Sequence, residues 1–190
     1  MQGEERPGQP VQPGENPAVR SAVSGVYDWM GAVIFSLIAV TLAFAFLFRV
    51  VGVKGDSMNS TLSDGERLIV TRLFYRPERG DIVIVGRPDG QPLVKRVIAA
   101  GGDRLRIGED GVFVNGKRLD EPYARGTTAS GGFGTQEQAV PEGCAFVMGD
   151  NREHSKDSRN MAEIGFVRES DLVGRAVFRF FPLSRARVLS

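Results

Sequence analysis

Residues 29–48 read WMGAVIFSLIAVTLAFAFLF, a run of 20 uncharged and mostly apolar residues. An α-helix of this length crosses the hydrocarbon core of a bilayer. Tyr27 precedes the run and Phe48 ends it, as aromatic side chains do at the two membrane interfaces. The alternative is a buried core helix, but the run is apolar on all sides and the rest of the protein is small. The run is also too long for the apolar region of a cleaved signal peptide. We therefore predict an uncleaved transmembrane signal anchor over residues 25–53.

The segment before this run is rich in Pro, Gly, Gln and Glu, a composition that cannot bury a hydrophobic core. We expect residues 1–24 to form a disordered tail. The only positive residues of the tail before the apolar run are Arg6 and Arg20, and Arg49 and Lys54 follow the run closely. The positive-inside rule, taken alone, would place the C-terminal part in the cytoplasm, although the rule is weak for large translocated domains.

From residue 54 onward the chain changes to short apolar segments separated by turn residues. The expected strands cover residues 66–73, 81–85, 93–99, 104–107, 112–115, 144–148 and 172–181. The pair Asn115–Gly116 is typical of a two-residue hairpin turn. The sequence thus predicts a mainly β protein, with one antiparallel β-rich domain of about 135 residues over 54–190.

The composition excludes several classes of function. The net charge is +1, without the basic stripe of a nucleic-acid-binding protein. The chain has one cysteine, Cys144, and one histidine, His154, so neither a disulfide framework nor a Cys or His metal site is expected. We find no GxSxG, HExxH, Walker A or dinucleotide-binding motif. We therefore expect no metal, no cofactor and no nucleic-acid partner.

Three segments carry candidate chemistry, and the first is Gly55-Asp56-Ser57-Met58. A glycine-containing loop can expose a serine hydroxyl and direct backbone N–H groups at a developing oxyanion. Serine beside glycine is more often an ordinary turn residue. This tetrapeptide alone is therefore a weak signal.

The second segment is the strand that contains Lys95 and Arg96. Alternation along a strand places these two cations on opposite faces, each among apolar neighbours. Burial lowers the pKa of a lysine, whereas arginine stays protonated. A neutral lysine amine can take the proton of a serine hydroxyl. The alternative is that Lys95 extends its amine to water and buries only its stem.

The third segment is residues 149–159, GDNREHSKDSR, which follow a short apolar strand. It places many polar groups beside the core, where they need partners if they are buried. Asp157 and Arg159 are suited to pair and brace this loop. A plain solvated loop is the alternative interpretation.

Together these segments resemble, in order and spacing, the conserved boxes of the type I signal peptidases. GDSMNSTL at 55–62 is similar to the nucleophile box, and VKRVIAAGGD at 94–103 to the box that holds a general-base lysine. RGDIVIV at 79–85 and GDNREHSKDSR also resemble family boxes, as do VNGKRLDEPY and VPEGCAFVMGDN. The resemblance implies a β-rich catalytic domain of the signal peptidase and self-cleaving repressor type on one N-terminal transmembrane helix.

The resemblance also implies a role for each matching residue. Ser57 is the nucleophile, and its backbone N–H forms part of the oxyanion hole. Lys95 is the general base. Gly55 supports the oxyanion hole and stands where some members have a serine. Ser155 orients Lys95. Asp157 and Arg159 form an ion pair that braces the loop over 149–159, and Asp150 helps to hold this loop. Met58 is the candidate substrate-binding residue beside the nucleophile. His154 falls at a variable position, and we expect it on the surface.

Two positions depart from the family pattern. Ser60 and Gly101 stand where the nucleophile box and the lysine box usually have proline. Both replacements remove a constraint on a turn. They put the rigidity of the two loops in doubt more than the chemistry.

The implied protein is a membrane-bound serine endopeptidase that removes signal peptides from exported preproteins, cutting after small residues. Its partners are preprotein signal peptides and membrane lipid. The tail would be cytoplasmic and the catalytic domain extracytoplasmic. Two alternatives remain: a self-cleaving repressor-type hydrolase, which carries a DNA-binding domain in place of the anchor, and a membrane-tethered β domain that only binds proteins.

Overall fold

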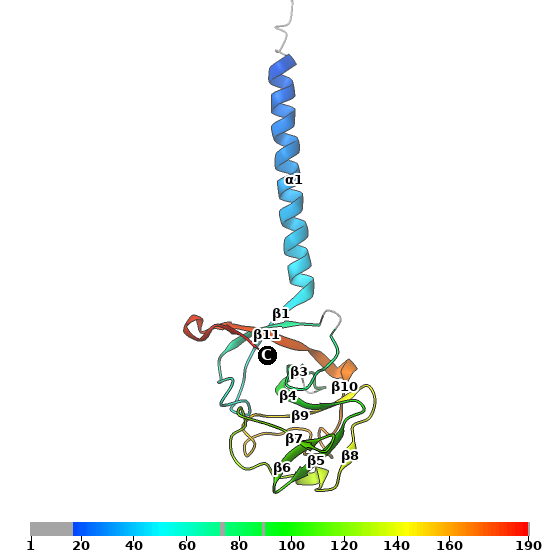
Figure 1. Cartoon of the computed structure of the whole chain (residues 1–190). Helices are drawn as coiled ribbons and strands as arrows, with labels where there is room; N and C mark the ends of the chain where they lie inside the picture. The colour runs from blue at the N-terminus through cyan, green and yellow to red at the C-terminus, as the bar shows by residue number, and fades with distance from the viewer. Residues whose placement is uncertain (1–16, 73–74, 89, 190) are drawn as a thin grey trace, which may run out of the picture. The chain divides into compact units, whose positions relative to one another are not determined.

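The computed structural model describes residues 17–72, 75–88 and 90–189. It consists of two units, residues 1–44 and 45–190, of which the second holds the β structure. Figure 1 shows the helix α1 and the strands of the second unit, most of which are labelled. The predicted tail over residues 1–16 lies outside the described residues.

Helix α1 runs over Pro17–Leu47. Within it, Trp29–Leu47 is long and apolar enough to cross a membrane, as the sequence predicted. The predicted boundaries were wrong at both ends. Residues 17–24 are helical although they were assigned to the tail, and the anchor assigned to 25–53 ends as a helix at Leu47. The chain then continues as a strand, because β-branched residues in this segment pair with a neighbouring strand.

The larger sheet has the strand order β1-β2-β11-β3-β4-β9-β10, with β12 paired to β11, and every pairing is antiparallel. The strands of this sheet are β1 (Phe48–Gly52), β2 (Arg67–Thr71), β3 (Ile82–Val85), β4 (Leu93–Ala100), β9 (Cys144–Met148), β10 (Val167–Arg168), β11 (Leu172–Phe181) and β12 (Arg187–Val188). The strand β4 therefore lies between two partners, which holds its backbone in place.

The smaller sheet has the order β7-β6-β5-β8. Its strands are β5 (Arg104–Gly108), β6 (Gly111–Val114), β7 (Lys117–Arg118) and β8 (Gln138–Ala139). The turn between β6 and β7 is Asn115–Gly116, as predicted, and both residues have positive φ. Three short 3₁₀ helices, η1 (Gly131–Phe133), η2 (Glu169–Asp171) and η3 (Leu183–Arg185), complete the described elements.

The core forms three apolar clusters. One lies among β2, β3, β4 and β11, a second joins β9 to the smaller sheet, and a third lines the other face of β3, β4 and β9. All seven predicted strands are present within a few residues of their expected limits. The fold class is therefore confirmed as mainly antiparallel β.

Gly101 has a packing reason to be glycine. A Cβ at this position would lie 3.1 Å from backbone atoms of Pro141, Glu142 and Gly143, tighter than ordinary van der Waals contact. The segment before β9 thus packs directly onto the turn that follows β4. Backbone packing takes the place of the constraint that proline would supply there.

Candidate active site

Ser57 lies in the loop that joins β1 to β2. A hydrogen bond of 2.8 Å from the Val53 N–H to the Glu66 oxygen closes this loop. Gly55 has φ +82° and donates its N–H to Asp64 Oδ1 at 2.7 Å. Gly55 therefore shapes the loop, since its own N–H is used within it.

The amine of Lys95 reaches Ser57 directly. Lys95 lies in β4 and is 2% exposed. Its Nζ is 2.6 Å from Ser57 Oγ. The alternative in which Lys95 extends its amine to water is therefore wrong, because the amine faces a serine hydroxyl inside the domain.

Burial controls the ionisation of this amine. Desolvation lowers the pKa of Lys95 from the usual 10.5 to about 8. The carboxylates of Asp157 and Asp150 act in the opposite direction, and Arg159 adds to the lowering. Both carboxylates are paired with arginines, so burial outweighs their attraction. A substantial share of Lys95 is neutral at mildly alkaline pH.

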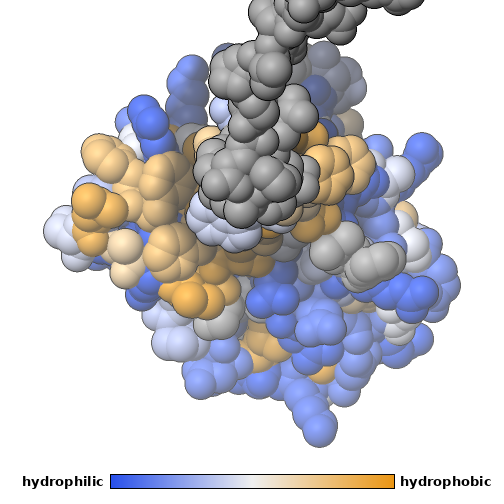
Figure 2. Space-filling model, turned by 90° about the horizontal axis from the view of Figure 1, so that it is seen from above, coloured by the Kyte–Doolittle hydropathy of each residue, from blue (hydrophilic) through white to orange (hydrophobic). Residues whose placement is uncertain are grey.

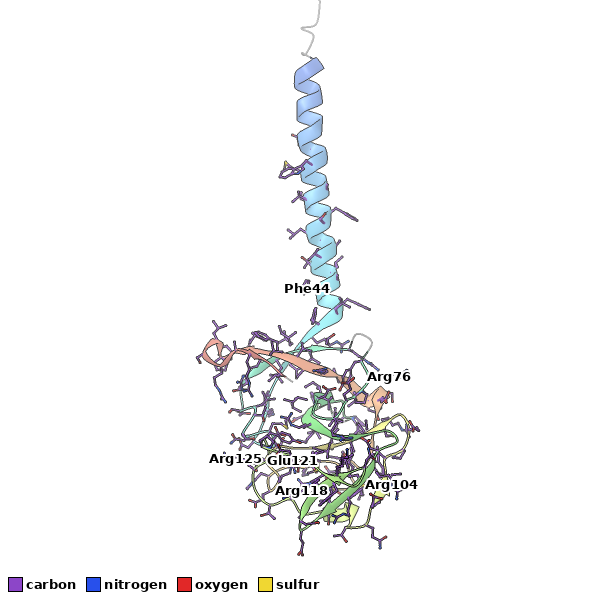
Figure 3. All side chains as sticks on the ribbon, in the orientation of Figure 1. Phe44, Arg76, Arg104, Arg118, Glu121 and Arg125 are labelled. Carbon is purple, nitrogen blue, oxygen red and sulfur yellow. The ribbon has the colours of Figure 1, made fainter. Side chains whose placement is uncertain are left out.

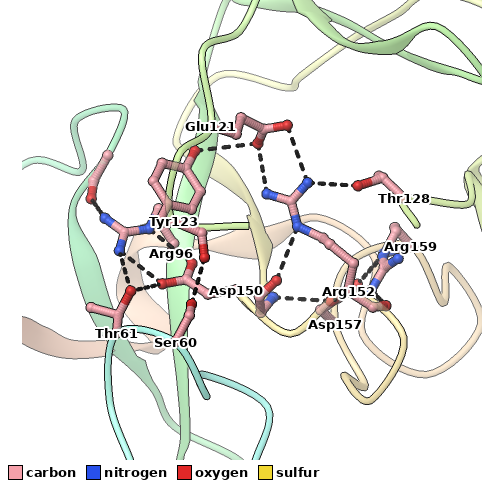
Figure 4. A network of polar contacts seen from close by, with 12 residues as sticks. Ser60, Thr61, Arg96, Glu121, Tyr123, Thr128, Asp150, Arg152, Asp157 and Arg159 are labelled. Atoms are coloured by element: carbon pink, nitrogen blue, oxygen red, sulfur yellow. Dashed lines mark hydrogen bonds and ion pairs between the residues drawn. The ribbon is translucent and has the colours of Figure 1, made fainter. Parts of the chain in front are cut away.

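Arg96, the next residue in β4, has a carboxylate partner (Figure 4). Its Nε is 2.9 Å from Asp150 Oδ1 and its Nη2 is 2.8 Å from Asp150 Oδ2, a bidentate ion pair. The Thr61 hydroxyl donates to the same carboxylate at 2.5 Å. Asp150 thus joins β4 to the nucleophile loop, whereas it was expected to hold the loop over 149–159.

Asp157 and Arg159 form the second bidentate pair. Arg159 Nε is 2.8 Å from Asp157 Oδ1, and Nη2 is 2.9 Å from Oδ2. Burial raises the pKa of Asp157, but the hydrogen bonds and charge of Arg159 outweigh burial and hold this pKa below its usual value. The Gly149 N–H also donates to Asp157 at 3.0 Å. The predicted ion pair is formed.

The loop after β9 packs against the nucleophile. The Asn151 N–H donates to the Ser57 oxygen at 3.0 Å, and its side-chain amide donates to the Asp56 oxygen at 3.2 Å. A Cβ on Gly149 would collide with the Ser57 oxygen and with Ser155 Oγ. Only glycine allows the two loops to approach this closely.

A segment that the sequence did not single out supports both loops. Residues 121–125 form a strap beside the loop after β9, and the Arg125 N–H donates to the Asp150 oxygen at 2.7 Å. The Tyr123 ring lies 4.0 Å from the Arg96 guanidinium, and its backbone oxygen accepts from Ser60 Oγ at 2.5 Å. Arg152 is buried and pairs with Glu121 at 2.6 Å (Figure 4). The only indication of this segment in the sequence was the resemblance of VNGKRLDEPY to the family.

Three expectations need correction or comment. Met58 is 1% exposed and belongs to a core cluster, so it offers no surface to a substrate, and its predicted binding role is not supported. Ser155 Oγ is buried and makes no hydrogen bond to Lys95, so the expected bond is not formed. The Ser155 hydroxyl lies close enough to Asp157 to help lower the pKa of that carboxyl. His154 is exposed, as predicted.

The backbone N–H of Ser57 has no acceptor at hydrogen-bond distance among the described residues. An unpaired N–H beside the nucleophile is the donor that an oxyanion requires. Within the same residues, no group of three or more His, Cys, Asp or Glu side chains is placed to hold a metal ion.

A serine hydroxyl lies against a buried lysine amine on an antiparallel β domain, an arrangement that fits a serine hydrolase with a lysine base. The family described as signal peptidase, peptidase S26, matches residues 26–181. The chain belongs to this family and is a serine endopeptidase of the signal peptidase I type.

Two relatives found by sequence agree with this assignment. The chain is 39% identical to signal peptidase I of Bacillus licheniformis over 86% of this chain and 93% of that one. It is 33% identical to signal peptidase IB of Staphylococcus aureus (strain COL) over 84% and 91%. A crystal structure of a signal peptidase I from Enterococcus faecalis V583 matches at 32% identity and a TM-score of 0.42, covering 53% of this chain and 97% of that one. Both alternatives, a repressor-type hydrolase and a binding module without activity, are set aside by family membership. With its apolar helix, the protein is membrane-anchored.

Proposed function

We propose that the chain removes N-terminal signal peptides from exported preproteins by a Ser–Lys dyad. Ser57 Oγ attacks the scissile carbonyl while Lys95 Nζ takes its proton. The contact that carries this proposal is the 2.6 Å distance between these two atoms. The tetrahedral intermediate then collapses, the scissile C–N bond breaks, and Lys95 returns the proton to the leaving amine, which gives an acyl-enzyme on Ser57. Lys95 next takes a proton from a water molecule that attacks the ester, and this proton returns to Ser57 Oγ as the carboxylate product leaves.

The ionisation of Lys95 supports its role as the base. A general base must be unprotonated before it accepts a proton, and it works best with a pKa near the working pH. Burial brings the pKa of Lys95 to about 8. Arg96 is equally buried but stays charged, so it can serve only as a structural cation.

The Ser57 N–H would stabilise the oxyanion of the tetrahedral intermediate. Asp150, Asp157 and Arg159 would hold the loops that carry this donor. We propose that Ser155 orients Lys95 during the reaction, since its hydroxyl is buried beside Asp157, whose carboxylate acts on the Lys95 amine. Ser155→Ala should then lower kcat more than it raises KM, and a variant with both constants unchanged would remove Ser155 from the mechanism.

An extended peptide would bind by strand addition. The strand β1 ends the order of the larger sheet, so among the described strands one of its edges has no partner. It runs directly into the loop that holds Ser57. A free edge beside the nucleophile supports a substrate that adds as a further strand, with small residues before the cleaved bond.

We propose a single-pass topology with the N-terminal tail in the cytoplasm and residues 54–190 outside it. The positive charges of Arg49 and Lys54 oppose this orientation on a simple count, but they precede a large domain, for which that count is a poor guide. Protease added to sealed right-side-out vesicles should digest the β domain. Protection of the domain until the vesicles are lysed would reverse the topology.

The decisive experiment is cleavage of a preprotein with an Ala-X-Ala site by the full-length enzyme in detergent. Ser57→Ala should lower kcat/KM by at least about 10⁴-fold, and Lys95→Ala by about 10²- to 10⁴-fold or more. The matched controls are Ser184→Ala and Lys117→Ala, which remove the same groups from exposed positions. Folded Ser57 and Lys95 variants that cut as well as these controls would overturn the dyad.

A further inference from the structure

One cavity of the described structure lies away from the dyad, where the chain passes from α1 into β1 at the edge of the larger sheet. Its volume is about 870 Å³. Arg49, Arg72 and Arg87 contribute to its lining, together with the apolar residues Phe46, Leu47 and Val173. The three arginines come from the start of β1 and from just after β2 and β3. The proposed peptidase chemistry uses none of these residues.

The charge of the cavity is unbalanced. Asp171 also lines it, which leaves three guanidinium groups against one carboxylate. Arg87 lies 3.5 Å from Glu163 and so has an anionic partner. No carboxylate of the described residues lies within ion-pair distance of Arg49 or Arg72. Guanidinium groups that line one cavity repel one another, and an oxyanion such as phosphate offsets this repulsion by bidentate hydrogen bonds.

The chain connection places this cavity at the membrane surface. The apolar span ends at Leu47, and Arg49 follows two residues later. A strand advances by about 3.3 Å per residue, so Arg49 lies within about 7 Å of the end of the span. The headgroups of a bilayer occupy the layer immediately outside its hydrocarbon core. The anion at hand in that layer is a lipid phosphate.

The surroundings are amphipathic, as a lipid is. Phe46, Leu47 and Val173 give the lining of the cavity an apolar part beside the charged groups. Val50 in β1 is a large apolar side chain exposed next to Arg49 in sequence. Phe181, Leu183 and Val188 are also exposed, but they lie around the other end of β11 from the cavity. Figure 2 shows apolar patches between polar ones on the face of the domain that is seen in this view.

We propose that this cavity binds the headgroup of an anionic phospholipid, with Arg49 and Arg72 as the principal phosphate ligands and Arg87 in support. The bound lipid would hold the β domain against the bilayer. The proposal rests on the membrane anchorage of α1 and is independent of the Ser57–Lys95 chemistry.

The test measures lipid retention by the full-length protein in non-ionic detergent, using native mass spectrometry with equal amounts of phosphatidylglycerol and phosphatidylcholine. The wild type should retain phosphatidylglycerol preferentially. The Arg49→Gln/Arg72→Gln variant should lose this preference by about 30-fold, the change expected for two basic side chains near a headgroup. Arg49→Lys/Arg72→Lys should keep part of it, because the charge remains.

The matched control is Arg118→Gln/Arg168→Gln, which removes two exposed arginines elsewhere in the domain. Arg118 lies at the end of the β domain remote from β1 (Figure 3). This control should retain the preference, as should Ser57→Ala, which separates lipid binding from peptidase activity. Thermal unfolding of each variant establishes that it is folded.

Three results would overturn the proposal. One is equal retention of the two lipids by the wild type. Another is a preference that persists in Arg49→Gln/Arg72→Gln. The third is that inorganic phosphate binds to the wild type but not to Arg49→Gln/Arg72→Gln, and displaces the lipid from the wild type. The cavity would then be a site for free phosphate.

Discussion

Lys95 and Arg96 are neighbours in β4, lie on opposite faces of that strand, and are 2% and 4% exposed. On one face, Arg96 meets Asp150 through two hydrogen bonds and lies against the Tyr123 ring. On the other face, Lys95 meets a neutral hydroxyl, while the nearest carboxylates are already paired with arginines. The two side chains are buried to a similar extent, and they differ in whether a carboxylate is hydrogen-bonded to the cation.

This contrast shows how one strand holds both a base and a structural cation. An unpaired buried ammonium loses its proton readily, since the charged form has lost its hydration without gaining an anion. A buried guanidinium keeps its charge and requires the anion. Replacing the two residues should therefore change stability in opposite directions, which the following predictions use.

The largest effect on stability is expected from Arg96→Met. This change leaves Asp150 buried without its cation, at a cost of about 3 to 5 kcal/mol in the free energy of unfolding. Urea denaturation of the full-length protein in detergent measures it. The double variant Arg96→Met/Asp150→Leu should recover most of the loss. If it is no more stable than Arg96→Met, the loss does not come from an unpaired Asp150.

Lys95→Met should raise the free energy of unfolding, whereas Arg96→Met lowers it. Below pH 8 the folded protein must keep Lys95 charged in a buried place, whereas the unfolded chain keeps it charged in water. Lowering of the pKa from 10.5 to about 8 corresponds to a gain of up to about 3 kcal/mol in the variant, less the lost contact with Ser57.

The pH dependence of this gain checks its origin. Between pH 8 and 10.5 the unfolded wild type binds more protons than the folded wild type, so its stability rises with pH. The advantage of Lys95→Met should therefore be full below pH 8 and disappear by about pH 10.5. A constant advantage across this range would show that packing, not ionisation, is responsible.

The rate of cleavage reports the same ionisation. Because the base must be neutral, kcat/KM should rise about tenfold per pH unit below the pKa of Lys95 and level off above it. The midpoint is expected near pH 8. Lys117→Ala serves as the control with an unchanged profile. A profile already flat from pH 6 to 9 would contradict a titrating lysine base.

The smallest effect is expected from Ser60→Ala. This change removes the hydrogen bond from Ser60 to the Tyr123 oxygen, worth about 1 kcal/mol in the free energy of unfolding. The midpoint of the pH profile should stay in place, because the dyad itself is untouched. A shifted midpoint would mean that the strap over 121–125 couples the two faces of β4. The matched control is Ser184→Ala.

Much of the fold followed from local pattern. The apolar run predicted the spanning helix, and alternation with turn residues predicted β4, β9 and β11 nearly to the residue. The start of α1 and the strand at Phe48–Gly52 were missed. The apolar run is followed directly by residues that suit a strand, so only pairing with β2 shows where the helix ends.

The candidate site divides in the same way. Ser57, Lys95, Asp157 and Arg159 were identified by resemblance, and the structure brings each pair together. Met58 was misplaced because adjacency to a nucleophile in sequence says nothing about which way a side chain points. Glu121, Tyr123 and Arg152 were missed because their partners lie far along the chain.

By itself, the sequence determined the elements, since helix length and strand alternation are properties of consecutive residues. It also determined that one strand carries two adjacent cations on opposite faces. Only the tertiary structure decided which cation receives a carboxylate, because Asp150 and Ser57 reach β4 from segments 54 and 38 residues away. The pKa of Lys95 depends on burial and on the pairing of distant charges, so it is a property of the folded domain.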